Sequence, residues 1–421
     1  MINVIIKYRY QLLIGVIILV ALYLRFWHID RVVPYTWDQG RDSWVVRDLL
    51  RGNFPLRGPR TGVGDFYLGP AYYYLLAPFY FISDLDPIGA QYFNIAANVV
   101  TLILLYWVTE KIFSRRTAFA ALFLYAFSLH TISGSMIPWN VSLVPALTIA
   151  IIFCLYRVLS GNYKYLVAVA ALAGFAFHIH FTAVFLPFVI LPYLIIATFR
   201  GKTKFLKWSL VSLPFFVVWF VPTIVESLIT YNDNYYRFVN FLKTFLMGFH
   251  ARFMFYRLSD SLIQFAAVIN FRAIEFIKYI IPLVFIVVAA VDKRPKVKIN
   301  SLLMATWFLV PLLGFTLYKG HVTDYYYLIN LPVVIIILAY LIDKVFSLKM
   351  MVLNITMIIG LAVYFLVNTN RFWSKPDTGG LYRQKMDVGA VIDGRERIGY
   401  TEGDIKSYLY TIWVEDGRTR R

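Results

Sequence analysis

Residues Trp37 to Asp42 place two carboxylates and one guanidinium within five positions, directly after the first long apolar run. If a helix begins near Asp38, then Asp38, Arg41 and Asp42 share one of its faces, because residues three and four positions apart are neighbours on a helix. A carboxylate held beside an arginine where a membrane helix meets water could act as a base for substrates that arrive from the lipid. The alternative interpretation is structural, with Asp38 as the cap of a solvated helix start.

Two further segments carry side chains that could meet Asp38 in one outward-facing cavity. The first is aromatic, includes Tyr72 and Tyr73, and is interrupted by a Gly-Pro pair. The second contains Lys319, His321 and Tyr325. The two cations could hold a lipid phosphate, because their charge matches that of phosphate, and the tyrosines could line a sugar or lipid path. Their alternative role is anchoring at the membrane interface, where tyrosine and basic residues are common.

The pair His178 and His180 lies at a tight turn between two apolar runs. Two histidines could begin a metal site, but their alternating spacing suits a strand better than a helix, and the only cysteine, Cys154, is remote in the sequence. We therefore expect His180 to form hydrogen bonds near the outer membrane surface and expect no metal, although a divalent ion is the alternative. A single cysteine also excludes an intrachain disulfide.

The elements that must position these residues are membrane helices. Hydrophobic residues make up 60% of the 421 and charged residues only 15%, whereas a soluble domain carries about a quarter charged residues. Apolar runs of about 18 residues or more recur, and each is long enough to cross a bilayer. The sequence therefore predicts an all-α polytopic membrane protein, with about eleven spans. They cover approximately 10–27, 88–110, 117–132, 140–158, 165–178, 180–199, 208–228, 276–291, 301–318, 325–342 and 350–368.

The distribution of basic residues predicts the orientation. With a cytoplasmic N-terminus, lysines and arginines gather in the short loops on the inner side, whereas the short outer loops carry few. This asymmetry explains the net charge of +18 and argues against a nucleic-acid partner. The outer side then holds the first loop, about 28–87, with an interfacial helical segment interrupted by prolines, and a polar tail at 371–421. We expect residues 1–370 to form the membrane domain. The aromatic residues of the tail suggest that it packs on the outer surface, and its polar runs could equally leave it partly disordered.

Several motifs resemble those of GT-C fold glycosyltransferases that use polyprenyl-phosphate sugars, such as the protein O-mannosyltransferases and the lipid A aminoarabinose transferases. The resemblance rests on the motifs Asp38–Asp42, Leu49–Asn53, Gly69–Tyr74, Ser114–Ala121 and Tyr325–Pro332. The first outer loop carries the most specific part of it, and the eleven-span topology with an inner N-terminus also agrees.

The resemblance implies that Asp38 is the catalytic base. This chain has Asp-Gln where the family usually has Asp-Glu, so Arg41 and Asp42 are expected to orient the base or the acceptor. The lysine that the aminoarabinose transferases carry before the prolines of the interfacial segment is absent. We therefore assign donor binding to other side chains as a hypothesis. They are Lys319, His321, His180, Tyr325, Tyr72 and Tyr73.

The predicted function is transfer of a hexosyl or pentosyl group, with inversion, from a polyprenyl-phosphate carrier to a hydroxyl of a protein, lipid or glycan outside the cytoplasm. A transporter or flippase of lipid-linked sugars is the main alternative. It is disfavoured because the unusual polar residues lie on one side, the deepest parts of the spans lack acidic residues, and no inverted repeat is found. A second alternative is a non-catalytic membrane subunit that holds acceptors.

Overall fold

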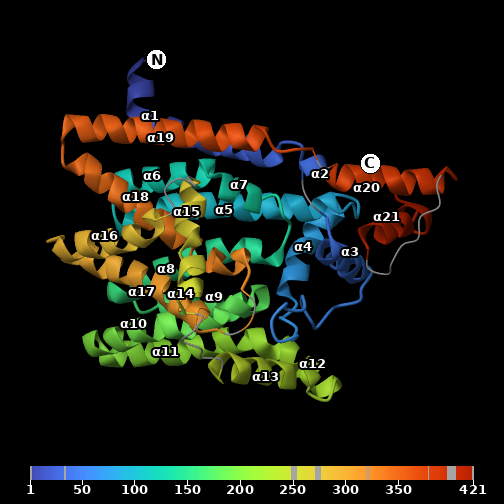
Figure 1. The fold of residues 1–421 in the computed structure, drawn as a ribbon. Coiled ribbons are helices and arrows are strands. Elements are labelled where there is room, and N and C mark those ends of the chain that lie inside the picture. The colour runs from blue at the N-terminus through green and yellow to red at the C-terminus, as the bar shows by residue number, and fades with distance from the viewer. Residues whose placement is uncertain are drawn as a thin grey trace.

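The computed structural model describes residues 2–32, 35–247, 254–270, 276–318, 320, 322–377, 379–395 and 404–419. In this part of the chain the regular structure is helical, and the only β-type pairing is an isolated bridge between Arg60 and Tyr67. The long helices lie side by side as a bundle (Figure 1). This arrangement confirms the all-α fold class expected from the sequence.

Each predicted membrane span coincides with a helix or with a 3₁₀ turn that runs into one. They are α1 (Ile2–Phe26), α5 (Ile88–Ile112), α6 (Arg115–Phe127), η1–α8 (Asn140–Leu143, Val144–Leu159), α9 (Tyr165–Ile179), η2–α10 (Phe181–Phe185, Leu186–Arg200), α11–η3–α12 (Lys202–Val217, Val218–Phe220, Val221–Ile229), α16 (Ile277–Val291), α17 (Pro295–Leu317), η6–α18 (Asp324–Ile329, Leu331–Ser347) and α19 (Met351–Trp373). Six of the described helical segments are long and apolar enough to cross a membrane. The protein is therefore an integral membrane protein, and the count of eleven spans and their orientation stay predictions.

The centre of the bundle is α18, whose residues from Leu331 to Tyr340 are all buried. It contacts α6, α8, α16, α17 and α19. A helix that is apolar on every face is stable only when other apolar elements surround it, and the neighbouring helices supply that surrounding. By contrast, α19 is buried along little of its length, as its position at the edge of the bundle in Figure 1 indicates.

The first outer loop folds into short elements at one end of the bundle. They are α2 (Ile29–Val32), α3 (Trp37–Leu50), an extended turn at 58–68 and α4 (Ala71–Ile82). The remaining short helices are α7 (Leu129–Gly134), α13 (Asp233–Met247), α14 (Met254–Ser261) and α15 (Ile263–Ile269). The expected interfacial segment corresponds to α4, which begins after Pro70 and is shorter than a membrane span.

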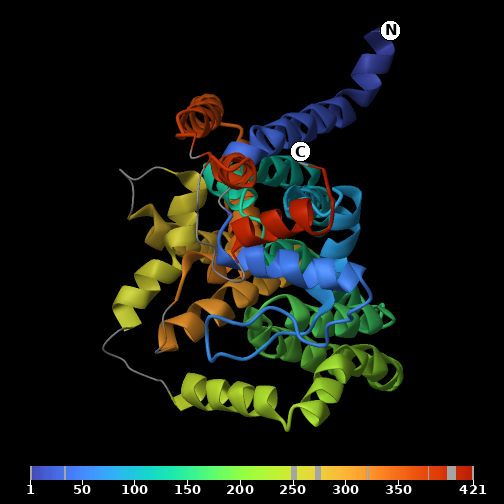
Figure 2. The same cartoon turned by 90° about the vertical axis from the view of Figure 1, so that its right-hand side faces the viewer.

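The C-terminal tail contains α20 (Gly380–Ile392) and α21 (Ile405–Val414). Both lie against the first outer loop, with α21 beside α3 in both views (Figures 1 and 2). The carboxylate of Asp416 accepts hydrogen bonds from Arg47 at 2.7 and 2.8 Å and is also paired with Arg51. The Tyr408 ring packs edge-on against Trp44. The tail therefore packs on the outer-loop elements, as its aromatic content predicted.

Candidate active site

The helix α3 begins one residue before Asp38, because Thr36 and Gln39 form a reciprocal capping box. The Oε1 atom of Gln39 accepts from the Thr36 backbone N–H at 2.8 Å, and its Nε2 donates to the Pro138 carbonyl at 3.0 Å. The interpretation of Asp38 as helix cap is therefore wrong. The second bond needs an amide donor, which a glutamate in place of Gln39 would lack.

Arg41 lies between the two carboxylates of α3. Its guanidinium donates to Asp38 at 2.8 Å and to Asp42 at 2.7 and 2.9 Å. The side chain of Asp42 is buried, whereas that of Asp38 is 41% exposed. The predicted shared face is confirmed, and it divides into an accessible carboxylate, a bridging guanidinium and a buried carboxylate.

Burial raises the pKa of Asp42, and the adjacent Arg41 guanidinium opposes that rise. Burial lowers the pKa of Arg41, but the carboxylates of Asp42 and Asp38 raise it more, so the net pKa is well above its usual range. The Tyr73 hydroxyl also contacts this pair, and burial raises its pKa. Arg41 is therefore a permanent cation that Asp42 holds in place from the buried side.

Asp38 and Arg41 open into a polar cavity of about 280 Å³. His180 and Tyr325, two of the residues predicted to bind the donor, line the same cavity. The other lining residues come from the first residue of α3, from the 59–68 turn, from η1 and the residue before it, from η6, and from the start of η2. They are Trp37, Pro59, Arg60, Thr61, Gly62, Asp65, Leu68, Trp139, Asn140, Val141, Phe181 and Tyr326. The cavity thus joins four predicted residues from three distant parts of the sequence.

Arg60 is the cavity residue that the sequence reasoning missed. It lies on the extended turn, where Gly58 N–H donates to the Leu68 carbonyl at 2.7 Å and Leu68 N–H donates to the Pro59 carbonyl at 3.0 Å. Its guanidinium pairs with Asp65, and its side chain is 48% exposed. One sequence feature could have indicated it. The oppositely charged residues Arg60 and Asp65 flank a Thr-Gly pair just before the aromatic motif.

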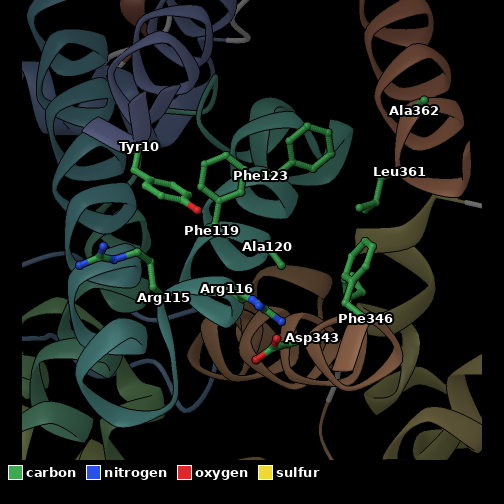
Figure 3. Close-up of a pocket in the computed structure, with 11 residues that line it drawn as sticks. Tyr10, Arg115, Arg116, Phe119, Ala120, Phe123, Asp343, Phe346, Leu361 and Ala362 are labelled. Carbon is green, nitrogen blue, oxygen red and sulfur yellow. The ribbon is translucent and has the colours of Figure 1, made fainter. Parts of the chain in front are cut away.

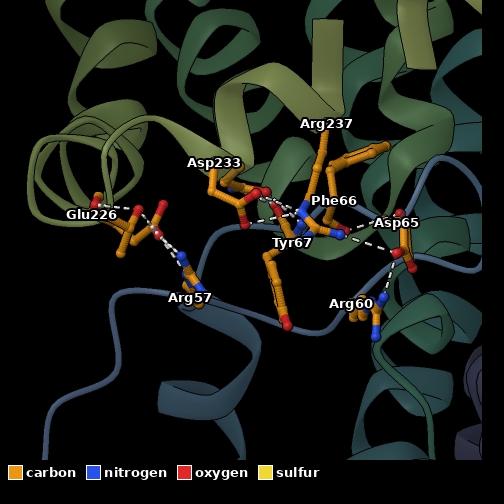
Figure 4. A network of polar contacts seen from close by, with 11 residues as sticks. Arg57, Arg60, Asp65, Phe66, Tyr67, Glu226, Asp233 and Arg237 are labelled. Carbon is orange, nitrogen blue, oxygen red and sulfur yellow. Dashed lines mark hydrogen bonds and ion pairs between the residues drawn. The ribbon is translucent and has the colours of Figure 1, made fainter. Parts of the chain in front are cut away.

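A network of ion pairs joins this turn to α12 and α13 (Figure 4). Arg237 donates to Asp65 at 3.1 Å and to Asp233 at 2.9 Å, which continues the pair between Asp65 and Arg60. Because these side chains are largely exposed, the network adds little free energy of unfolding but limits the positions that the turn can take. Arg57 forms a separate pair with the buried carboxylate of Glu226.

The two histidines have separate structural partners. Nδ1 of His178 accepts from the Ala71 backbone N–H at 3.3 Å, and Nε2 donates to the Trp219 carbonyl. A Cβ on Gly69 would lie 2.2 Å from His178 Nδ1, so glycine is required where the outer loop passes this ring. Nδ1 of His180 lies 2.9 Å from the Thr182 hydroxyl. Burial lowers the pKa of His180 to about 3, so its ring is neutral.

The remaining predicted residues fall in other places. Tyr72 is completely buried and packs against Phe93 rather than lining the cavity. Lys319 and His321 lie outside the described residues.

A metal does not fit the carboxylates that the described cavity provides. Asp38 is bonded to Arg41, and Asp65 is bonded to both Arg60 and Arg237. Within the described ranges, no group of three or more His, Cys, Asp or Glu side chains could hold a metal ion. We therefore derive no chemical step through a metal.

Two larger, mainly apolar cavities adjoin the polar one. A cavity of about 410 Å³ between α9, α12 and α13 shares Leu68 and Phe181 with it. A cavity of about 460 Å³ on the other side shares Trp139, Val141 and Tyr325, and also has polar side chains such as His130. Charged groups and aromatic rings thus lie between two spaces large enough for lipid or sugar groups.

Comparisons with known proteins identify the class. Residues 68–222 match the family model described as dolichyl-phosphate-mannose-protein mannosyltransferase. No curated protein matches the chain. The structure is similar to that of ArnT from Cupriavidus metallidurans bound to undecaprenyl phosphate, with a TM-score of 0.62 and 13% identity over 91% of this chain and 70% of ArnT. The apo form of ArnT gives a TM-score of 0.61 and 11% identity over 96% and 84%.

The archaeal oligosaccharyltransferase AglB from Archaeoglobus fulgidus, in complex with an inhibitory peptide and a dolichol-phosphate, is also similar. It gives a TM-score of 0.57 and 12% identity over 96% of this chain and 60% of AglB. At these identities the structures establish the fold, and the family match adds the activity class. The chain is a membrane glycosyltransferase with the GT-C fold, which confirms the resemblance found in the sequence.

Proposed function

We propose that the protein transfers a sugar from a polyprenyl-phosphate carrier to an acceptor hydroxyl on the extracytoplasmic face of the membrane. The observation that carries the proposal is the polar cavity that combines the accessible Asp38 carboxylate with the cations Arg41 and Arg60. The adjoining apolar cavities support a lipid-borne donor. ArnT and AglB were solved with undecaprenyl phosphate and a dolichol-phosphate, which supports the same class of donor here.

Asp38 is the proposed general base. Its carboxylate accepts the proton of the acceptor hydroxyl while that oxygen forms a bond to the anomeric carbon of the sugar. The bond between the anomeric carbon and the phosphate oxygen breaks, and its electron pair stays on the phosphate. Because this displacement is direct, the anomeric configuration inverts. The departing phosphate is a stable anion, so it needs cations nearby rather than a strong general acid.

Arg60 and Arg41 are the proposed cations for the donor phosphate, since charge-assisted hydrogen bonds from arginine match phosphate oxygens. Arg41 also keeps Asp38 oriented, through its hydrogen bond to that carboxylate. Lys319 and His321 stay proposed contributors to phosphate binding. His180 is neutral and is proposed to contribute a hydrogen bond rather than a charge, and Tyr325 is proposed to pack against the sugar together with Trp139, whose ring lies 4.8 Å from it.

The test is a transfer assay with purified protein in detergent and a panel of polyprenyl-phosphate hexoses and pentoses. Free polyprenyl phosphate is measured for the wild type and for Asp38→Asn. Loss of the base should lower turnover by about 10²–10⁴-fold. Asp48→Asn is the matched control, because Asp48 lies on the same helix with its side chain half exposed and does not line the cavity.

Turnover of Asp38→Asn at the wild-type rate would refute the role of Asp38. If no donor in the panel is consumed by folded wild-type protein, the proposed donor class is wrong. The same protein in sealed vesicles would then be assayed for movement of the lipid-linked sugar across the membrane, as the flippase alternative requires.

A further inference from the structure

A cavity of about 520 Å³ lies at the end of the bundle opposite the proposed active site. The helix α18 joins the two, because it begins just after Tyr325 and ends near Asp343 and Phe346, which line this second cavity. At 1.5 Å per residue, the 12 positions from Leu331 to Asp343 correspond to about 18 Å along α18, and η6 separates Leu331 from Tyr325. The cavity is therefore separate from the transfer site.

The walls of this cavity are mainly apolar and come from α6, α18 and α19 (Figure 3). Phe119, Ala120 and Phe123 of α6 form one wall, and Leu361 and Ala362 of α19 form the opposite wall. Nearer the outer loops, α19 contacts α6 and the start of α7, where Phe127 packs edge-on against Phe365 at 4.9 Å. The groove therefore lies between α6 and α19 and opens toward the end of the bundle at which α6 begins.

The rim of the groove carries two arginines and one carboxylate. Arg115 and Arg116 open α6 and both line the cavity. Arg115 donates to Glu110 at 2.7 Å and remains 62% exposed. Arg116 is exposed, and no ion pair to it occurs within the described ranges. Asp343 also lines the rim, where its carboxylate accepts from the hydroxyl groups of Ser114 and Thr117 at 2.7 and 2.8 Å.

We infer that this groove binds an anionic phospholipid, with its phosphate at Arg115 and Arg116 and one acyl chain between α6 and α19. The occupant follows from two features together. An apolar groove between membrane helices suits an acyl chain, and two arginines at its mouth suit a phosphate that carries net negative charge. The lipid would come from the leaflet opposite to the one that adjoins the Asp38 cavity.

The binding experiment separates the contribution of the lipid head group from that of the acyl chains. Delipidated full-length protein in detergent is titrated with phosphatidylglycerol or with phosphatidylcholine of the same acyl chains, and bound lipid is counted by native mass spectrometry. The wild type should bind phosphatidylglycerol about tenfold more tightly, since each arginine near a lipid phosphate contributes severalfold. Arg115→Gln/Arg116→Gln should bind both lipids equally.

A matched control changes charge elsewhere at the same end of the bundle. Lys202 and Lys204 are exposed on α11 and do not line the groove, so Lys202→Gln/Lys204→Gln should keep the wild-type preference. Ala120→Trp fills the groove and should weaken the binding of both lipids. If Ala120→Trp does not fold, Ala362→Trp blocks the groove from the exposed helix α19 instead.

Three results would overturn the inference. They are equal binding of the two lipids by the wild type, an unchanged preference in the double arginine variant, and unchanged binding in a folded groove-filling variant. None of these readouts depends on glycosyl transfer, so the inference can fail while the proposed function holds.

Discussion

Arg41 is the residue on which the geometry of the proposed base depends, because it bonds both Asp38 and Asp42. A planar guanidinium can contact two carboxylates at once, whereas a lysine ammonium is a flexible point charge. Arg41→Lys should therefore keep the charge but lower kcat by about tenfold or more, since a base displaced by about 1 Å loses much of its efficiency.

The measurement for Arg41→Lys is kcat and KM in the transfer assay, with Arg51→Lys as the control. Arg51 lies at the other end of α3, is half exposed, and pairs with Asp416 rather than with the cavity. If Arg41→Lys raises KM and leaves kcat at the wild-type value, Arg41 binds the donor and does not orient Asp38.

For individual residues, the sequence predicted those features of the site that depend on the spacing of neighbouring residues along one helix. The positions of Asp38, Arg41 and Asp42 followed from helical periodicity, and the family resemblance supplied the role of Asp38. Arg60 could not be found in this way, because an extended turn brings it to the cavity from a separate part of the chain. The structural role of Gln39 was also missed, since its partner, the Pro138 carbonyl, is 99 positions away.

Among the elements, α3 is held from two sides, by α4 and by the tail. The Ser43 hydroxyl lies 2.7 Å from that of Tyr80 on α4, and Asp416 binds Arg47 on the face toward α21. The sequence predicted a tail packed on the outer surface but could not specify its partner, because ion pairs between positions 47 and 416 leave no periodic pattern. The tail thus stabilises the helix that carries Asp38.

Removing the Asp416 carboxylate should detach the tail. Both side chains of the pair with Arg47 are mostly buried. Asp416→Asn leaves Arg47 with only the 3.6 Å contact to Asp48 and should weaken docking by about 3 kcal/mol. Limited proteolysis should then cleave the tail of the variant at neutral pH but not that of the wild type. Asp393→Asn is the control, because Asp393 lies directly after α20 and pairs with Arg395 within the tail.

The ion pair between Asp416 and Arg47 also predicts that the docking of the tail depends on pH. Hydrogen bonds from Arg47 hold the pKa of Asp416 below its ordinary value, so the native state binds fewer protons than the unfolded state. The stabilisation is complete above the unfolded pKa of about 3.9 and is lost as the pH falls through the lower native value. The wild-type tail should therefore resist proteolysis near neutral pH and become cleavable only in strong acid. If the tail of Asp416→Asn is protected as well as that of the wild type at every pH, this prediction is wrong.

For the whole molecule, the apolar runs predicted the helices well, because a bilayer demands long apolar segments whatever the tertiary packing. The sequence could not show that α18 is central and α19 peripheral, since both are apolar and only their neighbours differ. Nor could it show the groove beside α19, because α6, α18 and α19, which line it, are far apart in the sequence. The charge pattern predicts what the bundle itself does not reveal, namely which end faces the cytoplasm.

The orientation can be tested with single cysteines, because the chain has only Cys154, which is buried in α8. In a Cys154→Ala background, Asp48→Cys places a thiol at a half-exposed position of α3, and Lys204→Cys places one at an exposed position of α11. If basic loops face the cytoplasm, an impermeant maleimide should label Asp48→Cys in right-side-out vesicles and Lys204→Cys only after permeabilisation. The reverse pattern would place the Asp38 cavity on the cytoplasmic side and would require a donor presented from that leaflet.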